Sequence, residues 1–302
     1  MPDWAALLTE QRNPASTHID EVSTLEMLEI INREDARVAS AIQRELPAIV
    51  QAAELVATTL GSGGRLLYMG AGTSGRLGIL DAAECPPTYG TDPEMVQALI
   101  AGGSGAVFQA IEGVEDRREA GMLDLQQRAL SSRDAVVGIA ASGVTPYVLG
   151  GLEYAHSLSC GTILFTCSPS AARDVEADIK IVPRVGPEVI TGSTRMKAGT
   201  ATKMVLNMIS TAAMIKQGKT YGNLMVDLQP KNAKLQDRSI RILTTLAHVS
   251  ADEARQHLLK ANWNLKVALV MVLCGLECDE ADALLEKHKG IVKNAMHNHQ
   301  NH

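Results

Sequence analysis

The sequence predicts an α/β protein built on a doubly wound, mostly parallel sheet of five strands. From residue 65 onward short apolar runs alternate with helix-like segments, and two of the intervening loops are rich in glycine and hydroxyl side chains. Buried parallel strands form such continuous apolar runs when helices cover both faces of the sheet. The expected strands lie near 65–70, 96–102, 135–141, 161–167 and 178–183, and the helices near 75–83, 105–112, 115–130, 146–157 and 169–175.

The first strand leads into a glycine-rich turn, Gly70-Ala71-Gly72-Thr73-Ser74-Gly75, that opens a helix-like segment. Such a turn binds anions, because the first N–H groups of a helix lack intrahelical partners and the helix dipole adds partial positive charge. The third strand leads in the same way into Ala141-Ser142-Gly143-Val144-Thr145-Pro146. Two hydroxyl-bearing loops on adjacent strands predict a phosphate group that is held from two sides.

Other interpretations of the first loop have less support. Gly70-x-Gly72-x-x-Gly75 matches a dinucleotide fingerprint, but the second strand runs into Gly102-Gly103-Ser104-Gly105 where an acidic residue is expected. A P-loop fails because Arg76-Leu77 follows in place of Lys-Ser/Thr. The Thr73 and Ser74 hydroxyls favour a monophosphate, and an ordinary tight turn with no ligand stays an alternative.

Helical segments flank this α/β region on both sides. We expect an N-terminal arm and helices over 1–60, the α/β domain over 61–222, and a connector with a three-helix subdomain over 223–302. A long apolar helix runs from about Gly192 to Gln217, with Ser193 or Thr194 as its cap. In the last region, Ser250-Ala251-Asp252-Glu253 has the pattern of a capping box, and Asp279 is expected to begin the final helix.

Composition narrows the classes of partner. The chain has 302 residues, 46% hydrophobic and 21% charged, as in an ordinary globular protein. A net charge of −6 and only 3% aromatic residues argue against nucleic acid as a partner. No apolar run is long enough for a membrane span, so no membrane partner is expected.

The cysteines and histidines give no sign of a metal or a cofactor. Five cysteines are an odd number, and no signal peptide precedes them, which favours a reducing cytoplasm. Cys274 and Cys278 lie four residues apart in an apolar helical stretch, where packing is the expected role. No Ser-His-Asp arrangement or metal-ligand spacing emerges, and no metal or cofactor is expected.

The two loops resemble those of the sugar isomerase (SIS) fold, a doubly wound domain that binds phosphosugars, which implies a SIS domain over 61–222. The finer match covers nearly the whole chain and is to the N-acetylmuramic acid 6-phosphate etherase family. The matching segments, of which the first is the most specific, are Asp81-Ala82-Ala83-Glu84-Cys85-Pro86-Pro87-Thr88-Tyr89-Gly90, Ile111-Glu112-Gly113-Val114-Glu115-Asp116, Gly192 to Thr200, Asn223-Leu224-Met225-Val226-Asp227, Thr9-Glu10 and Ile19-Asp20.

This resemblance implies a lyase that cleaves the lactyl ether at C3 of a 6-phosphosugar, giving N-acetylglucosamine 6-phosphate and D-lactate in the recycling of cell-wall sugars. Such a reaction needs one protonated and one ionised carboxyl group. By motif position the proton donor falls on Glu84 and the proton acceptor on Glu115. Apolar neighbours of Glu84 predict partial burial, which favours the protonated form, whereas arginines next to Glu115 would favour the ionised form. Glu112 stays a competitor for the role of the base.

The resemblance also implies the residues that hold the substrate and the assembly state. Domains of this fold commonly pair, so a homodimer whose active sites take residues from both subunits is implied. An alternative function of a different class stays open: a non-catalytic regulatory protein that senses phosphosugars. Such a protein needs no acid–base pair. The expected binding residues, with Arg195 or Lys197 as partner of the lactyl carboxylate, are Thr73, Ser74, Gly75, Ser142, Gly143, Thr145, Thr194, Arg195 and Lys197.

Overall fold

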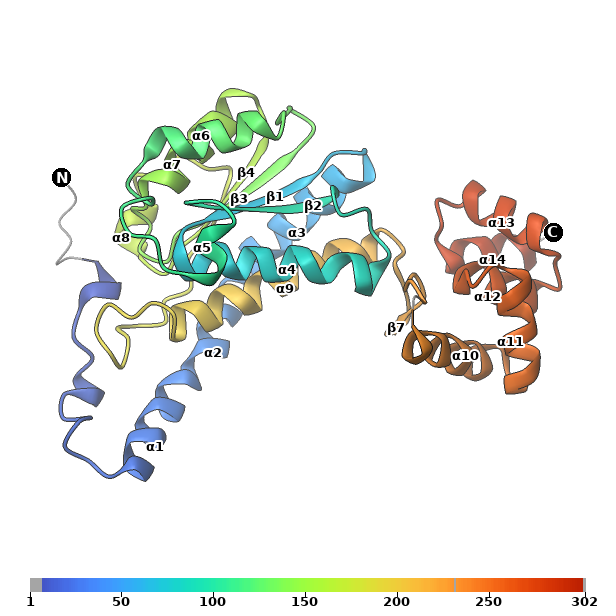
Figure 1. Ribbon diagram of the computed structural model, residues 1–302, viewed down its shortest axis with the longest axis horizontal. Helices are drawn as coiled ribbons and strands as arrows, with labels where there is room; N and C mark the ends of the chain where they lie inside the picture. Colours follow the sequence, from blue (N-terminus) through green and yellow to red (C-terminus); the bar gives the residue numbers. More distant parts are fainter. Residues whose placement is uncertain (1–6, 231, 301–302) are drawn as a thin grey trace. The chain divides into compact units, whose positions relative to one another are not determined.

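A computed structural model describes residues 7–230 and 232–300 of the chain (Figure 1). It divides into two compact units. The first comprises the residues up to Ala83 together with Glu94–Thr211, and the second comprises Glu84–Pro93 together with the residues from Ala212 onward. The first and last predicted domains include residues 1–6 and 301–302, which lie outside the described residues. The sequence also predicts that a helix of the connector begins at Lys231, and this residue lies outside them as well.

The first unit is organised around the predicted five-stranded sheet, whose strands all run parallel in the order β2-β1-β3-β4-β5. This confirms the doubly wound fold class and places the strands that carry the two hydroxyl-bearing loops side by side. Gly70 at the end of β1 is in register with Ile139 at the end of β3. The strands are β1 Leu66–Gly70, β2 Val96–Ile100, β3 Ala135–Ile139, β4 Gly161–Phe165 and β5 Ile179–Ile181.

Helices cover both faces of this sheet, as Figure 1 shows. One face packs against α6 (Arg118–Gln127) and α7 (Pro146–Ser157), through a core that includes Met69 and Leu152. The other face is covered by α3 (Leu46–Gly61), α4 (Gly72–Tyr89) and α9 (Lys197–Lys216). The other helices of the unit are α1 Thr24–Asp35, α2 Arg37–Gln43, α5 Gly105–Phe108 and α8 Pro169–Ala172, with 3₁₀ turns at Leu8–Glu10 and Pro14–Ser16.

A buried polar cluster fixes α4 against β1 and α9. The Asp81 carboxylate accepts hydrogen bonds from the Tyr68 hydroxyl at 2.8 Å, the Asn207 amide at 2.6 Å and the Ser210 hydroxyl at 3.1 Å. Asp81 is only 6% exposed, and a buried carboxylate is stable when its oxygens are satisfied in this way. The cluster therefore sets the position of the helix that begins at the glycine-rich loop.

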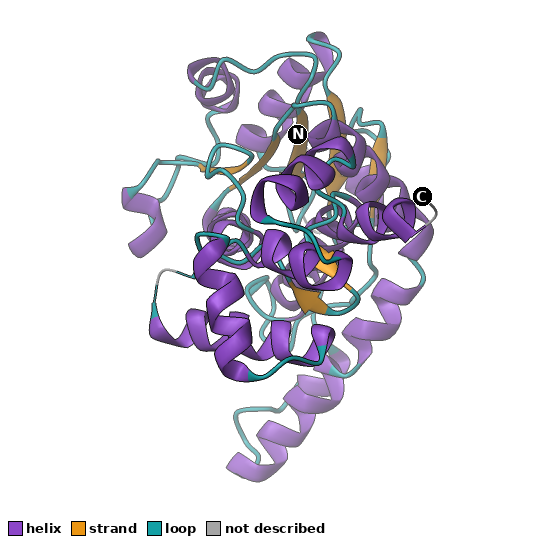
Figure 2. Cartoon of the chain, turned by 90° about the vertical axis from the view of Figure 1, so that its right-hand side faces the viewer, coloured by secondary structure: helices purple, strands orange, loops and turns teal. Residues whose placement is uncertain are grey.

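The second unit is helical apart from one short hairpin among its described residues (Figure 2). The sequence predicted three short helices after residue 250, whereas the described residues form four, because the stretch from Asp279 onward, expected to be one final helix, is divided near Gly290. The capping box between Ser250 and Glu253 is confirmed, whereas the helix expected at Asp279 begins at Cys278 and is not the last. The elements are β6 Thr220–Tyr221, β7 Leu224–Met225, α10 Ala233–Ala247, α11 Ala251–Lys260, α12 Leu265–Cys274, α13 Cys278–Lys287 and α14 Val292–Gln300.

Two helix bounds differ from expectation in the region of the predicted site. Helix α4 continues through Pro86 and Pro87 to Tyr89 instead of ending near residue 83. Helix α9 begins at Lys197, later than the predicted caps Ser193 and Thr194. Within the described residues, no helix combines the length and the apolar character that crossing a bilayer requires.

Candidate active site

A cleft of about 320 Å³ opens in the first unit at the carboxyl ends of β1 and β2. Ligands of doubly wound sheets bind at this edge, next to the point where the strand order reverses. Here β1 lies between β2 and β3, which makes it the reversal point. The cleft is lined by Ala71, Gly72, Thr73, Ser74, Arg76, Ala101, Ala106, Ala110, Ile111, Glu112, Val114, Glu115, Thr145 and Thr194.

The glycines of the first loop let the backbone pass close to the strand ends. A Cβ atom on Gly70 would lie 2.7 Å from the Gly75 nitrogen, and one on Gly75 would lie 2.6 Å from the Ile100 side chain. Gly72 has a φ of +53°, in the left-handed region that glycine adopts without strain. Gly75 thus has a packing role: it is buried and does not line the cleft.

Hydroxyl groups and the start of α4 make this cleft suitable for an anion. Thr73 and Ser74 lie in the first turn of α4, whose N–H groups have no intrahelical acceptor. Thr145 occupies the N-cap position of α7, yet its side chain accepts no capping hydrogen bond, so the hydroxyl is available to a ligand. The sequence left the orientation of Arg76 open. In the structure it lines the cleft and donates to the carbonyls of Val107, at 2.8 Å, and Gln109, at 3.0 Å.

The second predicted loop contributes Thr145 to the cleft lining but not Ser142 or Gly143. Gly143 is buried with a φ of +79°, and its N–H donates to the Ala140 carbonyl at 2.9 Å. The Ser142 hydroxyl accepts a hydrogen bond from the Val144 N–H at 3.5 Å. These two residues therefore form the turn that leads to Thr145.

Both candidate bases, Glu112 and Glu115, line the cleft, but their surroundings differ. Glu115 is half-buried, and its backbone carbonyl accepts a hydrogen bond from the Tyr147 N–H at 2.9 Å. The Tyr147 side chain is fully buried and donates to Asp124 at 2.6 Å. Glu112 is exposed and precedes Gly113, which is also exposed and has a φ of +76°. Glu115 is consequently the better positioned of the two.

The two arginines after Glu115 lie at the surface, as expected from the sequence. Arg117 and Arg118 are exposed, and Arg118 forms an ion pair with Glu153 on α7. The side chain of Arg118 is thus engaged on the surface of the α6–α7 pair. The influence of the two arginines on Glu115 stays a prediction.

Glu84 lies on α4 in the second unit and does not line this cleft. The predicted partial burial is wrong: Glu84 is exposed, together with Leu80, Ala83 and Pro87 on the same side of the helix. The reason is the helical period, since the buried side chains of Asp81, Ala82 and Cys85 occupy the opposite side.

Thr194, Arg195 and Lys197 lie on the segment that leads into α9, and they have different environments. Thr194 lines the cleft, and Arg195 is exposed. Lys197 is only 1% exposed and donates to Glu34 at 2.6 Å, so its charge is satisfied inside the protein and it does not line the cleft. Of the two candidates for the lactyl carboxylate, only Arg195 is accessible.

Two buried glutamates hold this segment, and sequence reasoning missed both. Glu188 accepts the Lys197 and Ala198 N–H groups at 3.0 and 2.9 Å, and so caps α9 in place of Ser193 or Thr194. Burial raises the pKa of Glu188 above its ordinary value. Glu34 binds Lys197 and Asn13, and Asn13 also donates to the Pro187 carbonyl at 2.9 Å. Two of these contacts, between Lys197 and Glu34 and between Asn13 and Pro187, join residues more than 160 positions apart, and no local pattern signals them.

Comparison with known proteins gives consistent matches along the chain. Residues 47–156 match the glucokinase regulatory protein N-terminal SIS domain, and residues 222–268 match the C-terminal lid domain of glucokinase regulatory protein. N-acetylmuramic acid 6-phosphate etherase of Edwardsiella ictaluri is 55% identical over 96% of this chain and 97% of its own length. The etherases of Pasteurella multocida and Escherichia coli are each 53% identical over the same shares.

Full-length relatives at this identity decide the family, whereas the two domain matches cover separate parts of the chain. The sheet order and the SIS match agree on the fold of the first unit. The chain belongs to the N-acetylmuramic acid 6-phosphate etherase family.

Proposed function

We propose that this protein is a carbon–oxygen lyase that cleaves the D-lactyl ether of N-acetylmuramic acid 6-phosphate. The products are N-acetylglucosamine 6-phosphate and D-lactate, and the reaction belongs to the recycling of cell-wall sugars. The observation that carries the proposal is a half-buried glutamate, Glu115, in a cleft lined by hydroxyl groups at a helix start, in a chain of the etherase family.

The phosphate group binds at the first turn of α4 in this proposal. The N–H groups of that turn and the hydroxyls of Thr73, Ser74 and Thr145 supply the hydrogen bonds. Among the described residues no lysine lines the cleft, so backbone dipoles and the Arg76 guanidinium provide the positive potential there. Ser142, Gly143 and Gly75 support these groups through the turns that they form.

Glu115 acts as the base on the ring-opened sugar. The C2 hydrogen lies next to the C1 aldehyde and is acidic, because the carbanion that its loss creates is delocalised onto the carbonyl oxygen. Glu115 takes this proton, and the electron pair expels the oxygen at C3. A positioned base of this kind contributes about 10²–10⁴ in rate.

Glu84 supplies the proton to the departing lactate oxygen. The unsaturated sugar aldehyde then accepts water at C3, with Glu115 returning a proton to C2 and Glu84 receiving one from the water. One water is consumed overall, and neither an oxidant nor a metal is needed for this balance. Arg195, exposed beside the cleft residue Thr194, is the proposed partner of the lactyl carboxylate.

Incubation of the purified chain with N-acetylmuramic acid 6-phosphate in deuterium oxide tests the reaction. We expect D-lactate to accumulate and one deuterium to appear at C2 of the N-acetylglucosamine 6-phosphate. D-lactate and the sugar are quantified enzymatically and by mass spectrometry. A folded protein that binds the phosphosugar without releasing D-lactate would identify a sensor instead, and a product without label at C2 would reject proton abstraction there.

We further propose that the protein is a homodimer with shared active sites. Ser74 and Glu84 lie ten residues apart on one continuous helix, about 15 Å at 1.5 Å per residue. That span exceeds the reach from a phosphate group to C3 of its own sugar. A second copy that supplies Glu84 to the cleft removes this difficulty.

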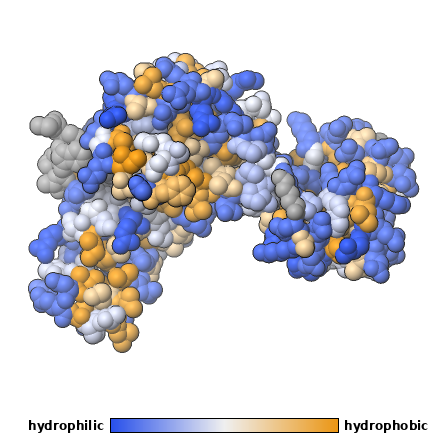
Figure 3. All heavy atoms as spheres, viewed as in Figure 1, coloured by the Kyte–Doolittle hydropathy of each residue, from blue (hydrophilic) through white to orange (hydrophobic). Residues whose placement is uncertain are grey.

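Exposed apolar side chains support a second copy. Leu25 and Leu28 on α1 are 70% and 57% exposed, and Leu80 on α4 is 48% exposed. Figure 3 shows apolar side chains gathered over α1. Burial of such side chains stabilises an assembly by about 1.5–3 kcal/mol for each leucine that becomes fully covered.

The double variant Leu25→Glu/Leu28→Glu is expected to be monomeric. Two carboxylates on the apolar side of α1 would have to be desolvated in the interface, at a cost that exceeds the gain from packing. Light scattering should give a mass near 32.2 kDa for the variant and twice that mass for the natural chain. Glu26→Gln/Glu29→Gln on the same helix is the control and should stay dimeric. A natural chain that is monomeric at micromolar concentration would contradict the proposal.

A further inference from the structure

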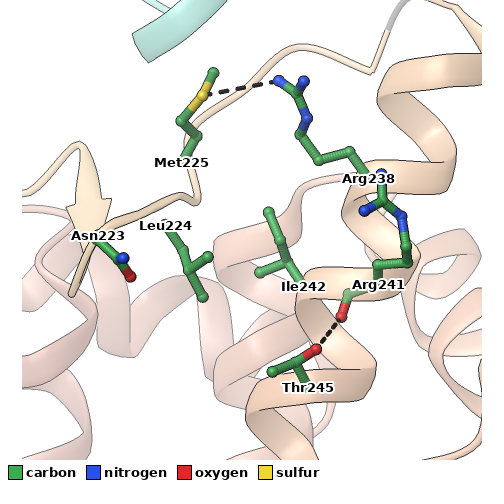
Figure 4. A pocket seen from close by; sticks show the side chains of 7 residues that line it. All are labelled: Asn223, Leu224, Met225, Arg238, Arg241, Ile242 and Thr245. Atoms are coloured by element: carbon green, nitrogen blue, oxygen red, sulfur yellow. Dashed lines mark hydrogen bonds between the residues drawn. The ribbon is translucent and has the colours of Figure 1, made fainter.

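A second pocket, of about 310 Å³, lies within the second unit, and the predicted reaction makes no use of it. It is formed by the β6–β7 hairpin and α10 (Figure 4). The matched lid-domain region, 222–268, contains the whole lining. The lining residues are Asn223, Leu224, Met225, Arg238, Arg241, Ile242 and Thr245.

Several contacts hold the hairpin side of this pocket in place. Gly222, with a φ of +58°, makes the tight turn between the two strands. Just after the hairpin, the Asp227 carboxylate accepts hydrogen bonds from Lys219 at 2.8 Å and from Lys266 at 2.7 Å. Burial lowers the pKa of Lys266, although Asp227 opposes this shift. The hairpin is thus anchored to the helical core of the unit.

The opposite wall carries two arginines one turn apart on α10. Arg241 donates to Asp237 on its own helix at 2.8 Å, which offsets its charge. Arg238 has no carboxylate partner among the described residues, and its recorded hydrogen bond is to the Met225 sulfur at 3.8 Å. A thioether is a weak acceptor. The guanidinium of Arg238 therefore presents an uncompensated positive charge and several unused donors to the pocket.

The other lining residues indicate which chemical groups the bound anion carries besides its negative charge. Leu224 and the buried Ile242 form an apolar wall, as Figure 4 shows, and they pack on the core of the unit. Asn223 offers an exposed amide, and Thr245 lies one turn beyond Arg241 on α10. Guanidinium groups bind carboxylates and phosphates through paired hydrogen bonds. The volume is within the lower range of small-molecule sites.

We propose that this pocket is a second ligand site, which binds a monosaccharide-sized or smaller organic anion through Arg238 and Arg241. The ligand joins a carboxylate or a phosphate to a small apolar group such as a methyl or N-acetyl group, which packs on Leu224 and Ile242. The chain as a whole has a net charge of −6, so attraction of an anion here depends on local positive charge, mainly that of Arg238. Anions of this class include both products of the proposed reaction, which makes the pocket a candidate effector site.

Heteronuclear NMR titration of the full chain tests the site with three separate probes: D-lactate, N-acetylglucosamine 6-phosphate and inorganic phosphate. We expect at least one organic probe to shift saturably the signals of 223–225 and 238–245. A response to D-lactate identifies a carboxylate ligand, and a response to the sugar phosphate alone identifies a phosphate ester. Changes confined to the signals of the cleft residues would overturn the proposal, whichever probe is used.

Variants then assign the binding to the arginines. Arg238→Ala should weaken the probe at this pocket at least tenfold, and Thr245→Glu should do the same by adding an opposing charge without removing an arginine. Arg255→Ala removes the same charge from an exposed position on α11 and should change the affinity by less than twofold. Equal losses in Arg238→Ala and Arg255→Ala would show that only general electrostatic attraction acts, and that result also overturns the site. Binding at the cleft serves as the internal control for folding, so failure here is distinguishable from failure of the proposed reaction.

Discussion

Replacing Glu115 with glutamine should lower D-lactate release by about 10²–10⁴-fold. Glutamine keeps the size of the side chain but cannot accept a proton from C2. The backbone anchor to Tyr147 uses the carbonyl of residue 115 and is unaffected by this change. Phosphosugar binding, measured by calorimetry, should remain within about threefold of the natural chain, since Thr73, Ser74 and Thr145 are intact.

Glu112→Gln is the matched control for this variant. Both glutamates line the same cleft, so each substitution replaces one carboxyl group of that cleft with an amide of the same size. If Glu115 is the base, the Glu112 variant should retain most of its turnover, because only the exposed member of the pair has changed. A larger loss of turnover at residue 112 than at residue 115 would reverse the assignment.

Glu84→Gln separates the role of the acid from that of the base. Without a proton donor the C3 oxygen leaves slowly, yet Glu115 can still remove and return the C2 proton. The Glu84 variant should therefore exchange C2 of the substrate with deuterium oxide while D-lactate release is low. The Glu115 variant should lose both the exchange and the release. Loss of exchange in the Glu84 variant would argue against a separate role for that residue.

The sheet and the cleft follow from local patterns in the sequence. Each strand is a short apolar run, and the loops after β1 and β3 carry glycine and hydroxyl residues whose roles depend only on strand ends and helix starts. The confirmed strand order places both loops side by side. The positions of Thr73, Ser74 and Thr145 in one cleft were predictable to that extent, whereas Glu115 was assigned from the resemblance to the etherase family.

The sequence did not predict the environments of Lys197 and Glu84. Lys197 has the pattern of a ligand-binding cation at a helix start, yet Glu34 from α1 binds it in the interior. Glu84 has apolar neighbours in sequence but an exposed position on α4, because chain neighbours lie on different sides of a helix. The pairing of Lys197 with Glu34 is not encoded in residues close along the chain, whereas the exposure of Glu84 follows from the helical period once α4 is known to continue to Tyr89.

The buried pair of Lys197 and Glu34 carries a large expected effect on stability. The two side chains are 1% and 2% exposed and lie 2.6 Å apart. Glu34→Gln leaves the Lys197 ammonium buried without its carboxylate, which destabilises a protein by about 3–5 kcal/mol. Thermal or urea unfolding should show this loss. The double variant Glu34→Gln/Lys197→Met should recover part of it, since no unpaired charge remains.

The stabilisation that the Lys197–Glu34 pair provides is expected to decrease as the pH falls. Burial alone would raise the pKa of Glu34, but the hydrogen bonds from Lys197 and Asn13 lower it below 4.5. A carboxyl with a lowered pKa in the folded state stabilises the protein above its unfolded pKa, and this contribution is lost as the pH falls through the folded value. Glu188 has a raised pKa, so its contribution to stability changes with pH in the opposite direction. Because the natural chain and the Glu34→Gln variant both contain Glu188, its contribution cancels in their difference. The stability difference between the natural chain and Glu34→Gln should therefore shrink as the pH falls below about 4.5, and a difference that does not change with acid would contradict an ionised Glu34.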